Sequence, residues 1–244
     1  LYSVSFYDDH SRVIQVHSTN NSGKKDTIIS QYSFSGQLLR TLVCHGKGIA
    51  NDGITPGLRV LTKMEYSPAG HLIKVMKKTG NSPEVTIAQN TYDELGRLMN
   101  KKIGLVRNAS NQNSYTASPL DSLTYSYNIR GWLRGINKDY ARNENGAVNW
   151  FGMELCYDFG FTNAYLNGNI AGARWRSRGD DAQRAYGFTY DAVNRLTNAN
   201  FTQQSQSTKT WNTSDGIDFS STFNYDANGN ILSMNQKGLV VNQS

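Results

Sequence analysis

The chain has 244 residues and a formal net charge of +6, and 11% of its residues are aromatic while only 18% are charged. This balance excludes an intrinsically disordered chain, and no apolar run reaches the ~18 residues that a transmembrane helix needs. The chain has 22 glycines and 26 asparagines but only four prolines. Because Gly and Asn accept the positive φ of tight turns, the composition predicts an all-β protein with many short hairpins.

One seven-residue motif recurs along the chain, with the template Tyr-Asp-x-x-Gly/Asn-Arg/Asn-Leu/Ile. In chain order, the seven full copies span 7–13, 32–38, 66–72, 92–98, 127–133, 190–196 and 225–231. The residues assigned to this structural motif are Tyr7, Asp8, Tyr66, Gly70, Tyr92, Asp93, Gly96, Arg97, Leu98, Tyr127, Gly131, Tyr190, Asp191, Asn194, Arg195, Leu196, Tyr225, Asp226 and Gly229. Most copies begin 25 to 35 residues after the previous one. A repeat with such a period indicates that one structural unit is stacked many times.

The interval between the fifth and sixth copies is about twice the usual one. It holds two irregular copies, Tyr157-Asp158 without the remaining motif and 165–170 with one residue too few. We therefore expect a single repeat array over 1–244, irregular at 150–180. Two polar insertions, at about 108–118 and 205–215, are interpreted as long hairpin loops.

The chemistry of the motif predicts a β-hairpin turn. Asp at the second position can accept hydrogen bonds from backbone amides that follow it, and Gly or Asn at the fifth position can take the left-handed conformation. Tyr and Leu then face each other across the two strands. One such hairpin is marginal alone, whereas stacked copies share a continuous buried face.

These copies resemble the YD-repeat, or RHS-repeat, family. The segments 152–158 and 166–172, followed by Trp175-Arg176, are similar to a divergent block of bacterial RHS proteins. The resemblance implies repeated antiparallel β-hairpins that form a long curved or spiralling sheet, of which this chain would be an open segment. In that family the sheet builds a shell around a toxic polypeptide or supports cell-adhesion contacts, and bacterial members are exported.

The chain departs from the family pattern in its C-terminal part. The family's block rich in Arg-Tyr-Tyr-Asp-Pro, which precedes a self-cleavage site, has no counterpart here, and the chain is too short to close a shell. The self-cleaving aspartates and a toxin domain are therefore not transferred to any residue of this sequence.

No other motif indicates catalysis, a cofactor or a metal site. The Cys44-His45 pair and the Gly-rich stretch 46–53 are interpreted as strand and loop, because neither has a metal-ligand or phosphate-binding spacing. Cys44 and Cys156 are expected to be ordinary thiols, with a single disulfide as the alternative. We therefore expect no enzyme, with no catalytic residues, no cofactor and no metal.

The candidate ligand-binding residues are Arg174, Trp175, Arg176 and Arg178. On a strand, the three arginines would share one face, with Trp175 on the other, and could bind an anionic glycan or a phosphate chain. The alternative is a solvated face whose arginines pair with Asp180 and Asp181.

The sequence thus predicts a non-catalytic segment of an exported shell or cell-surface scaffold that encloses or presents a polypeptide. The alternative is an extracellular glycan- or protein-binding module resembling an adhesin. Expected partners are the rest of a longer chain or its cargo polypeptide, a surface glycan or protein, or a second copy through unpaired strand edges. The net charge does not specify nucleic acid, and the expected location is extracellular or the cell envelope.

Overall fold

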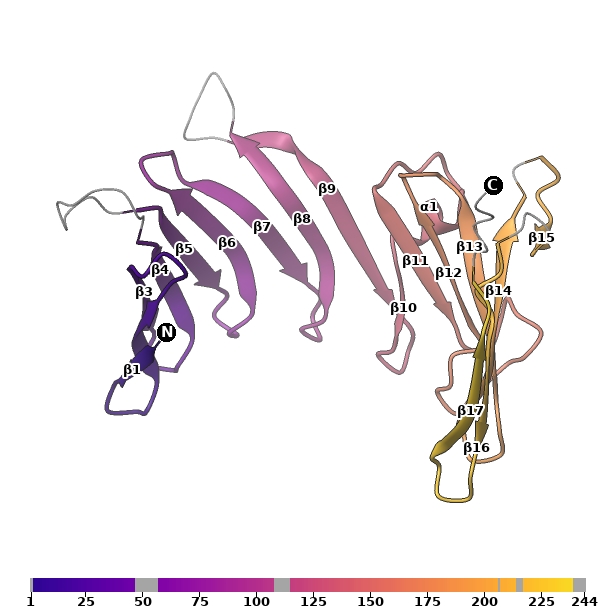
Figure 1. Cartoon of the computed structure of the whole chain (residues 1–244). Helices are drawn as coiled ribbons and strands as arrows, with labels where there is room; N and C mark the ends of the chain where they lie inside the picture. Colours follow the sequence, from indigo (N-terminus) through magenta and orange to yellow (C-terminus); the bar gives the residue numbers. More distant parts are fainter. Residues whose placement is uncertain (1, 47–56, 108–114, 206, 214–216, 239–244) are drawn as a thin grey trace, which may run out of the picture. The chain divides into compact units, whose positions relative to one another are not determined.

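The computed structural model describes residues 2–46, 57–107, 115–205, 207–213 and 217–238 (Figure 1). Backbone contacts divide the chain into two compact units, Leu1–Leu123 and Thr124–Ser244, and each unit is described by itself. The strands of the first unit are β1 (Ser3–Tyr7), β2 (Val13–Thr19), β3 (Lys25–Tyr32), β4 (Leu38–Cys44), β5 (Arg59–Tyr66), β6 (Leu72–Thr79), β7 (Val85–Tyr92) and β8 (Leu98–Arg107). Strand β9 (Tyr115–Tyr127) leads into the second unit.

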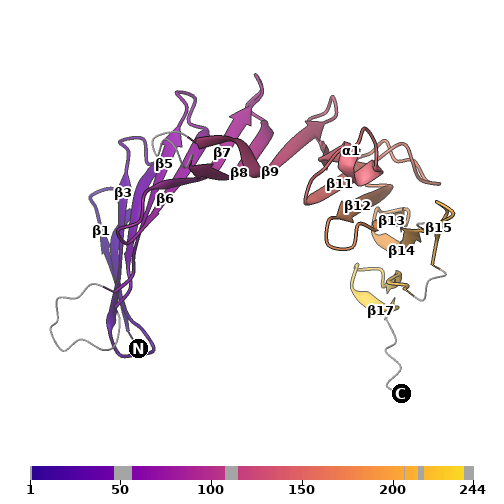
Figure 2. The ribbon, with the colours of Figure 1, turned by 90° about the horizontal axis from the view of Figure 1, so that it is seen from above.

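In the first unit, each strand from β1 to β8 pairs antiparallel with the next one along the chain (Figure 2). Among the side chains described in this unit, only Met76 and Thr86 are buried, and every residue of β1 is exposed. The strands of this unit form a single layer. Among the described residues of the unit, no other helix or strand covers either face of that layer, which explains the low burial.

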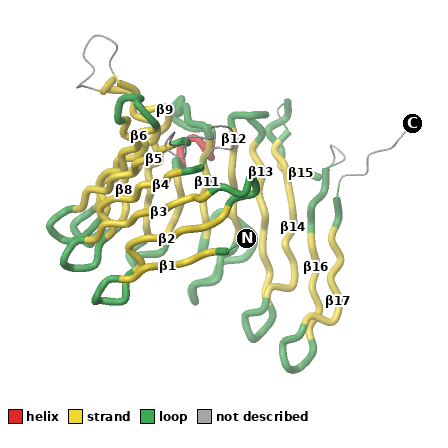
Figure 3. Tube along the Cα trace, turned by 60° about the vertical axis from the view of Figure 1, so that its left-hand side comes forward, coloured by secondary structure: helices red, strands yellow, loops and turns green. Residues whose placement is uncertain are grey.

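The second unit contains the remaining strands and one helix. They are β10 (Leu133–Ile136), α1 (Lys138–Arg142), β11 (Phe151–Cys156), β12 (Gly172–Ser177), β13 (Gln183–Tyr190), β14 (Leu196–Gln204), β15 (Trp211–Asn212), β16 (Ser221–Tyr225) and β17 (Ile231–Gln236). Each strand from β9 to β14 pairs antiparallel with the next one, β14 also pairs with β16, and β16 pairs with β17 (Figure 3). The predicted all-β fold of antiparallel hairpins is confirmed. Because no pairing joins the first strand to the last within the described residues of either unit, each sheet is open.

The two faces of the β11–β14 sheet are packed differently. One face buries an aromatic cluster, in which Phe201 lies against Tyr186 and Phe219 with ring centroids 5.4 Å and 5.3 Å apart. Trp175 stacks on Tyr186 in the same cluster. The other face carries α1, whose Tyr140 and Ala141 are buried. The second unit therefore has a core on both sides of its sheet.

Helix α1 was not predicted from the sequence. Its five residues are too few to be stable alone, and its N-cap residue Asn137 makes no side-chain capping bond. The helix is held by packing, because Gly152 of β11 lets the backbone of Asn137 and Ala141 approach so closely that a Cβ atom would lie 2.6 Å from the Asn137 carbonyl oxygen.

The predicted long loops need correction at their boundaries. Residues 108–114 lie outside the described residues, but 115–118 belong to β9 rather than to a loop. The short strand β15 interrupts the loop predicted at 205–215. The Gly-rich stretch 46–53 lies outside the described residues after Gly46. Among the described residues, no helix has the length and apolar character needed to cross a membrane.

Candidate functional site

The seven full copies of the motif form the same hydrogen-bonded turn. The amide of the fifth residue donates to the carbonyl of the second at 2.9–3.2 Å, and the amide of the second donates to the carbonyl of the sixth at 2.7–3.0 Å. The fifth residue has a positive φ of 61–89° in every copy; these residues are Ser11, Gly36, Gly70, Gly96, Gly131, Asn194 and Gly229. The left-handed position predicted from the Gly/Asn preference is confirmed.

The side chain of the second residue closes the turn. In the copy at 92–98, Asp93 accepts hydrogen bonds from the amides of Leu95 and Arg97, and its other oxygen accepts from the Arg97 guanidinium at 2.7 Å. Asp191 does the same with Val193 and Arg195. The preference for Asp at this position thus reflects its capacity to accept three hydrogen bonds at once.

In six repeats, including the irregular one that starts at Tyr157, the first residue links the turn to the previous copy. Its Tyr hydroxyl donates a hydrogen bond, 2.7–3.1 Å long, to the carbonyl of the aliphatic residue that ends the previous copy. The pairs are Tyr32 with Val13, Tyr66 with Leu38, Tyr92 with Leu72, Tyr157 with Leu133, Tyr190 with Ile170, and Tyr225 with Leu196. Replacing Tyr by Phe would remove this hydrogen-bond donor, which explains why Tyr occupies this position.

The sixth residue makes a second link between copies. In two copies an Arg side chain at this position lies over the ring of the next Tyr: Arg12 Cζ is 5.3 Å from the Tyr32 centroid, and Arg195 Cζ is 4.8 Å from that of Tyr225. Arg195 also donates to the carbonyl of Asp226, in the next turn. Cation–π contact and hydrogen bonding thus act together between neighbouring turns.

The two irregular copies together form one enlarged repeat. Tyr157 takes the place of the first residue, and Ile170 takes the place of the last, because each makes the link to the neighbouring copy described above. The twelve residues between them replace the usual five, and the amide of Ala171 donates to the carbonyl of Cys156 where the strands rejoin.

We expect Gly96→Val to lower the free energy of unfolding by about 1–3 kcal/mol, because a β-branched residue is strained at the φ of +76° found there. The new Cβ would also lie 2.9 Å from the His71 ring. Urea denaturation measures the effect. Gly131→Asn is the control, since Asn194 occupies the same motif position at φ 64° and the space around Gly131 is open. An unchanged midpoint for Gly96→Val would contradict the turn assignment.

We expect stability to fall in acid through the turn aspartates. The hydrogen bond from the Arg97 amide, followed by the bond from its guanidinium, holds the pKa of Asp93 below its usual value, and Arg195 does the same for Asp191. A lowered folded-state pKa stabilises the fold above the unfolded pKa of about 3.9, and the contribution is lost as pH falls through the folded value. Denaturant midpoints measured between about pH 6 and about pH 2 should therefore decline.

The double variant Asp93→Asn/Asp191→Asn separates charge from hydrogen bonding in that decline. Asn128 already occupies this position in another copy, where its side-chain oxygen accepts the amides of Arg130 and Trp132. The double variant should keep its turns and show a smaller decline in acid. An identical decline in wild type and variant would show that these two carboxylates do not contribute.

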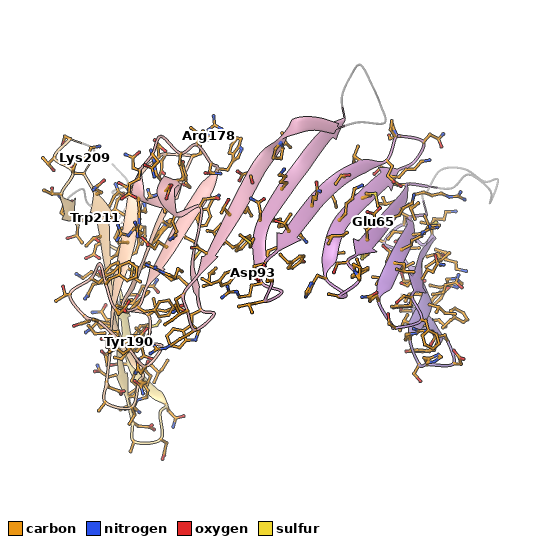
Figure 4. The ribbon with its side chains drawn as sticks, turned by 180° about the vertical axis from the view of Figure 1, so that it is seen from behind. Glu65, Asp93, Arg178, Tyr190, Lys209 and Trp211 are labelled. Carbon is orange, nitrogen blue, oxygen red and sulfur yellow. The ribbon has the colours of Figure 1, made fainter. Side chains whose placement is uncertain are left out.

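The structure separates the four candidate ligand-binding residues. Trp175 lies in the aromatic cluster, on the face opposite to Arg174 and Arg176. Arg176 is buried and pairs with Asp181 at 2.6 Å. Arg178 lies beyond the end of β12, and its Cζ atom is 4.8 Å from the centroid of the Trp150 ring. It is at the end of the strands remote from Tyr190 (Figure 4). The three arginines therefore do not form one open cationic face.

Arg174 shares a buried carboxylate with a residue of α1. Glu154 is fully buried; Arg142 donates to both of its oxygens, and Arg174 Nε lies 3.2 Å from Glu154 Oε2. The hydrogen bond with Glu154 raises the pKa of the Arg142 guanidinium, and burial raises the pKa of the neighbouring Cys156 thiol. Cys156 and Cys44 are both free thiols. Sequence reasoning missed the Arg142–Glu154 pair, for which no motif gives a signal.

Side chains that could hold a metal gather at one place in the described part of the chain. Asp8, Asp9 and His10 bring their ligand atoms within 4.8 Å of one another in the first turn. Asp8 is already used there, because it accepts the amides of His10 and Arg12 and pairs with the Arg12 guanidinium at 2.7 Å. The geometry is explained by the turn.

Comparison with known proteins gives only a distant structural likeness. No family model matches the chain. No curated protein matches it either. Among solved structures, it is similar to the crystal structure of TcdB2-TccC3 without its hypervariable C-terminal region, with a TM-score of 0.32 and 13% sequence identity. The match covers 96% of this chain and 15% of that one, so this chain spans a small part of its structural neighbour.

Proposed function

We propose that this chain is a non-catalytic segment of an exported shell or cell-surface scaffold that encloses or presents a polypeptide. The observation that supports this function is the use of the motif residues. In every full copy they build the turn, and in five of the seven the Tyr hydroxyl also donates to the preceding repeat. Residues that stand out in the sequence are thus engaged in the sheet itself, as expected for a scaffold.

The sequence resemblance to the YD-repeat family supports the same function. The partners it implies are the remainder of a longer chain and a cargo polypeptide. The open sheets of the two units fit this role, because an open repeat sheet can be extended by further hairpins at its edges.

Protease protection in the full-length gene product tests the proposal. We expect a polypeptide outside the repeats to resist protease while the repeats are folded, and to be cleaved once denaturant unfolds them. Gly96→Val should lower the denaturant concentration at which protection is lost. Cleavage of that polypeptide at the same rate with folded and unfolded repeats would contradict an enclosing shell.

A glycan- or protein-binding module is the second candidate, favoured by a cavity beside Arg174. A glycan array at physiological salt, with duplex DNA as control, separates the two functions. Selective glycan binding that survives added salt would favour the binding module, whereas binding to every anionic polymer that disappears with salt would reflect only the net charge.

A further inference from the structure

A cavity of about 540 Å³ opens on the face of the second unit that carries Arg174. It is lined by Gly160, Phe161, Thr162, Arg174, Ala185, Thr202 and Trp211. Ligand-binding cavities in proteins usually measure about 300–1,000 Å³, so this one can hold a small ring compound.

The shape of the cavity follows from the residues that lie beside Arg174 on the neighbouring strands. Ala185 of β13 lies opposite Arg174, and Thr202 of β14 lies opposite Ala185. Because the side chains of Ala185 and Thr202 are short and that of Arg174 is long, they leave open space above the sheet, and the strands form the floor of the cavity. Each of these residues is on a regular strand, so the floor has a fixed geometry.

One wall of the cavity is an aromatic ring held flat against the sheet. Phe161 lies over Gly172 and Gly187; a Cβ atom on Gly172 would come within 2.4 Å of the ring, and one on Gly187 within 3.4 Å. The absence of a side chain at Gly172 is therefore required for this wall, whereas a Cβ atom on Gly187 would only contact the ring. Trp211 of β15, labelled in Figure 4, also lines the cavity and is 39% exposed.

Among the described residues that line the cavity, Arg174 is the only charged one. Arg142 engages both oxygens of the buried Glu154, whereas Arg174 Nε contacts that carboxylate without a well-oriented hydrogen bond. Two guanidinium groups thus share one buried carboxylate. The other acidic partner of Arg142 is Glu144, which is 51% exposed and 3.6 Å away.

The Arg174 side chain faces the cavity. It is 23% exposed, and its Nη2 lies near Gly160, where an added Cβ would approach within 3.1 Å. A partly buried guanidinium favours a carboxylate, which it can bind with charge-assisted hydrogen bonds. Among the described residues, Glu154 is the only carboxylate within ion-pair distance of Arg174.

We propose that this cavity binds the carboxylate-bearing unit of an acidic saccharide. Arg174 would bind the carboxylate, and Thr162 and Thr202 offer hydroxyls for the hydroxyl groups of the sugar. Phe161 and Trp211 offer aromatic faces to the apolar C–H face of the sugar ring. The inference does not depend on the shell proposal, because a scaffold segment and a binding module can both carry such a site.

Isothermal titration calorimetry with D-glucuronate, D-glucose, acetate and an acidic peptide tests the proposal at physiological salt. We expect saturable binding of glucuronate. Glucose and acetate should bind at least about tenfold more weakly, because glucose lacks the carboxylate and acetate lacks the sugar ring. Arg174→Gln and Trp211→Ala should each weaken glucuronate binding by about tenfold or more. Arg178→Gln is the matched control and should bind as wild type, since that arginine stacks on Trp150 outside the cavity.

The outcomes separate this proposal from its alternatives. Equal binding of glucose, equal binding of acetate, tighter binding of the peptide, or no binding of glucuronate would each overturn it. An equal loss in Arg178→Gln would overturn the assignment to this cavity. If Arg174→Gln does not fold, Trp211→Ala decides, because Trp211 has no contact with the Glu154 ion pairs. Protease protection of a cargo is measured separately, so the shell proposal can fail or hold independently.

Discussion

Truncation of Phe201 to alanine should lower the free energy of unfolding by about 3–5 kcal/mol, the largest effect expected for a single apolar side chain here. Among the side chains that the structure describes, Phe201 is the largest of the fully buried ones, and its ring contacts Tyr186, Phe219 and Trp175. Its removal loses the transfer free energy of the ring and leaves a cavity between aromatic neighbours, of which Trp175 and Tyr186 are fixed on separate strands.

Urea denaturation followed by tryptophan fluorescence measures this loss, because Trp175 lies in the same cluster. Phe34→Ala is the control, since Phe34 is a turn residue with 100% exposure. The control should stay within about 0.5 kcal/mol of wild type. A loss of less than about 1 kcal/mol for Phe201→Ala would show that the aromatic cluster is not a packed core.

Replacement of Glu154 by glutamine should destabilise the second unit by about 3–5 kcal/mol, because it leaves Arg142 and Arg174 beside a neutral group. Glu154 has no exposed surface, and its carboxylate joins α1 to strand β12. The shape of the side chain is kept, so the loss reports the charge and not the packing.

Glu144→Gln provides a matched control for this charge. Glu144 also pairs with Arg142, but it is half exposed, and an exposed ion pair contributes only about 0–1 kcal/mol. Equal midpoints for Glu154→Gln and wild type in guanidinium chloride would show that the buried carboxylate does not hold α1 to the sheet. A loss in Glu144→Gln as large as that in Glu154→Gln would place the important pair at the surface.

The turns could be predicted from the sequence because their determinants are local. Asp93 and Gly96 lie three residues apart in a single turn, and both act on backbone groups within that turn. Neither requires knowledge of which strand lies beside the hairpin. The fold class follows from the same local rules, repeated seven times.

The links between copies depend on distant residues and could not be predicted. The hydroxyl of Tyr225 reaches the carbonyl of Leu196, 29 residues earlier, only because the two hairpins lie in register. The same holds for Arg142 and Glu154, whose contact needs a helix that forms by packing on β11. Helix propensity over five residues gives no usable signal for this.

The candidate binding residues show how a pattern succeeds and fails on one strand. Alternation correctly places Arg174 and Arg176 opposite Trp175, because all three lie within β12. It fails for Arg178, since the strand ends at Ser177 and the Arg178 amide turns to the carbonyl of Trp150. The carboxylates that pair with Arg174 and Arg176 come from other elements or from the turn that follows.

Amide hydrogen exchange resolved by residue tests the central claim, that every full copy of the motif forms the same turn. We expect slow exchange for the fifth residue of all seven copies, because its amide donates to the carbonyl of the second. The third residue donates no hydrogen bond within the described residues, so its amide should exchange at the rate of an unstructured chain wherever it is not proline. Equal exchange at the third and fifth positions, in any full copy, would contradict the shared turn.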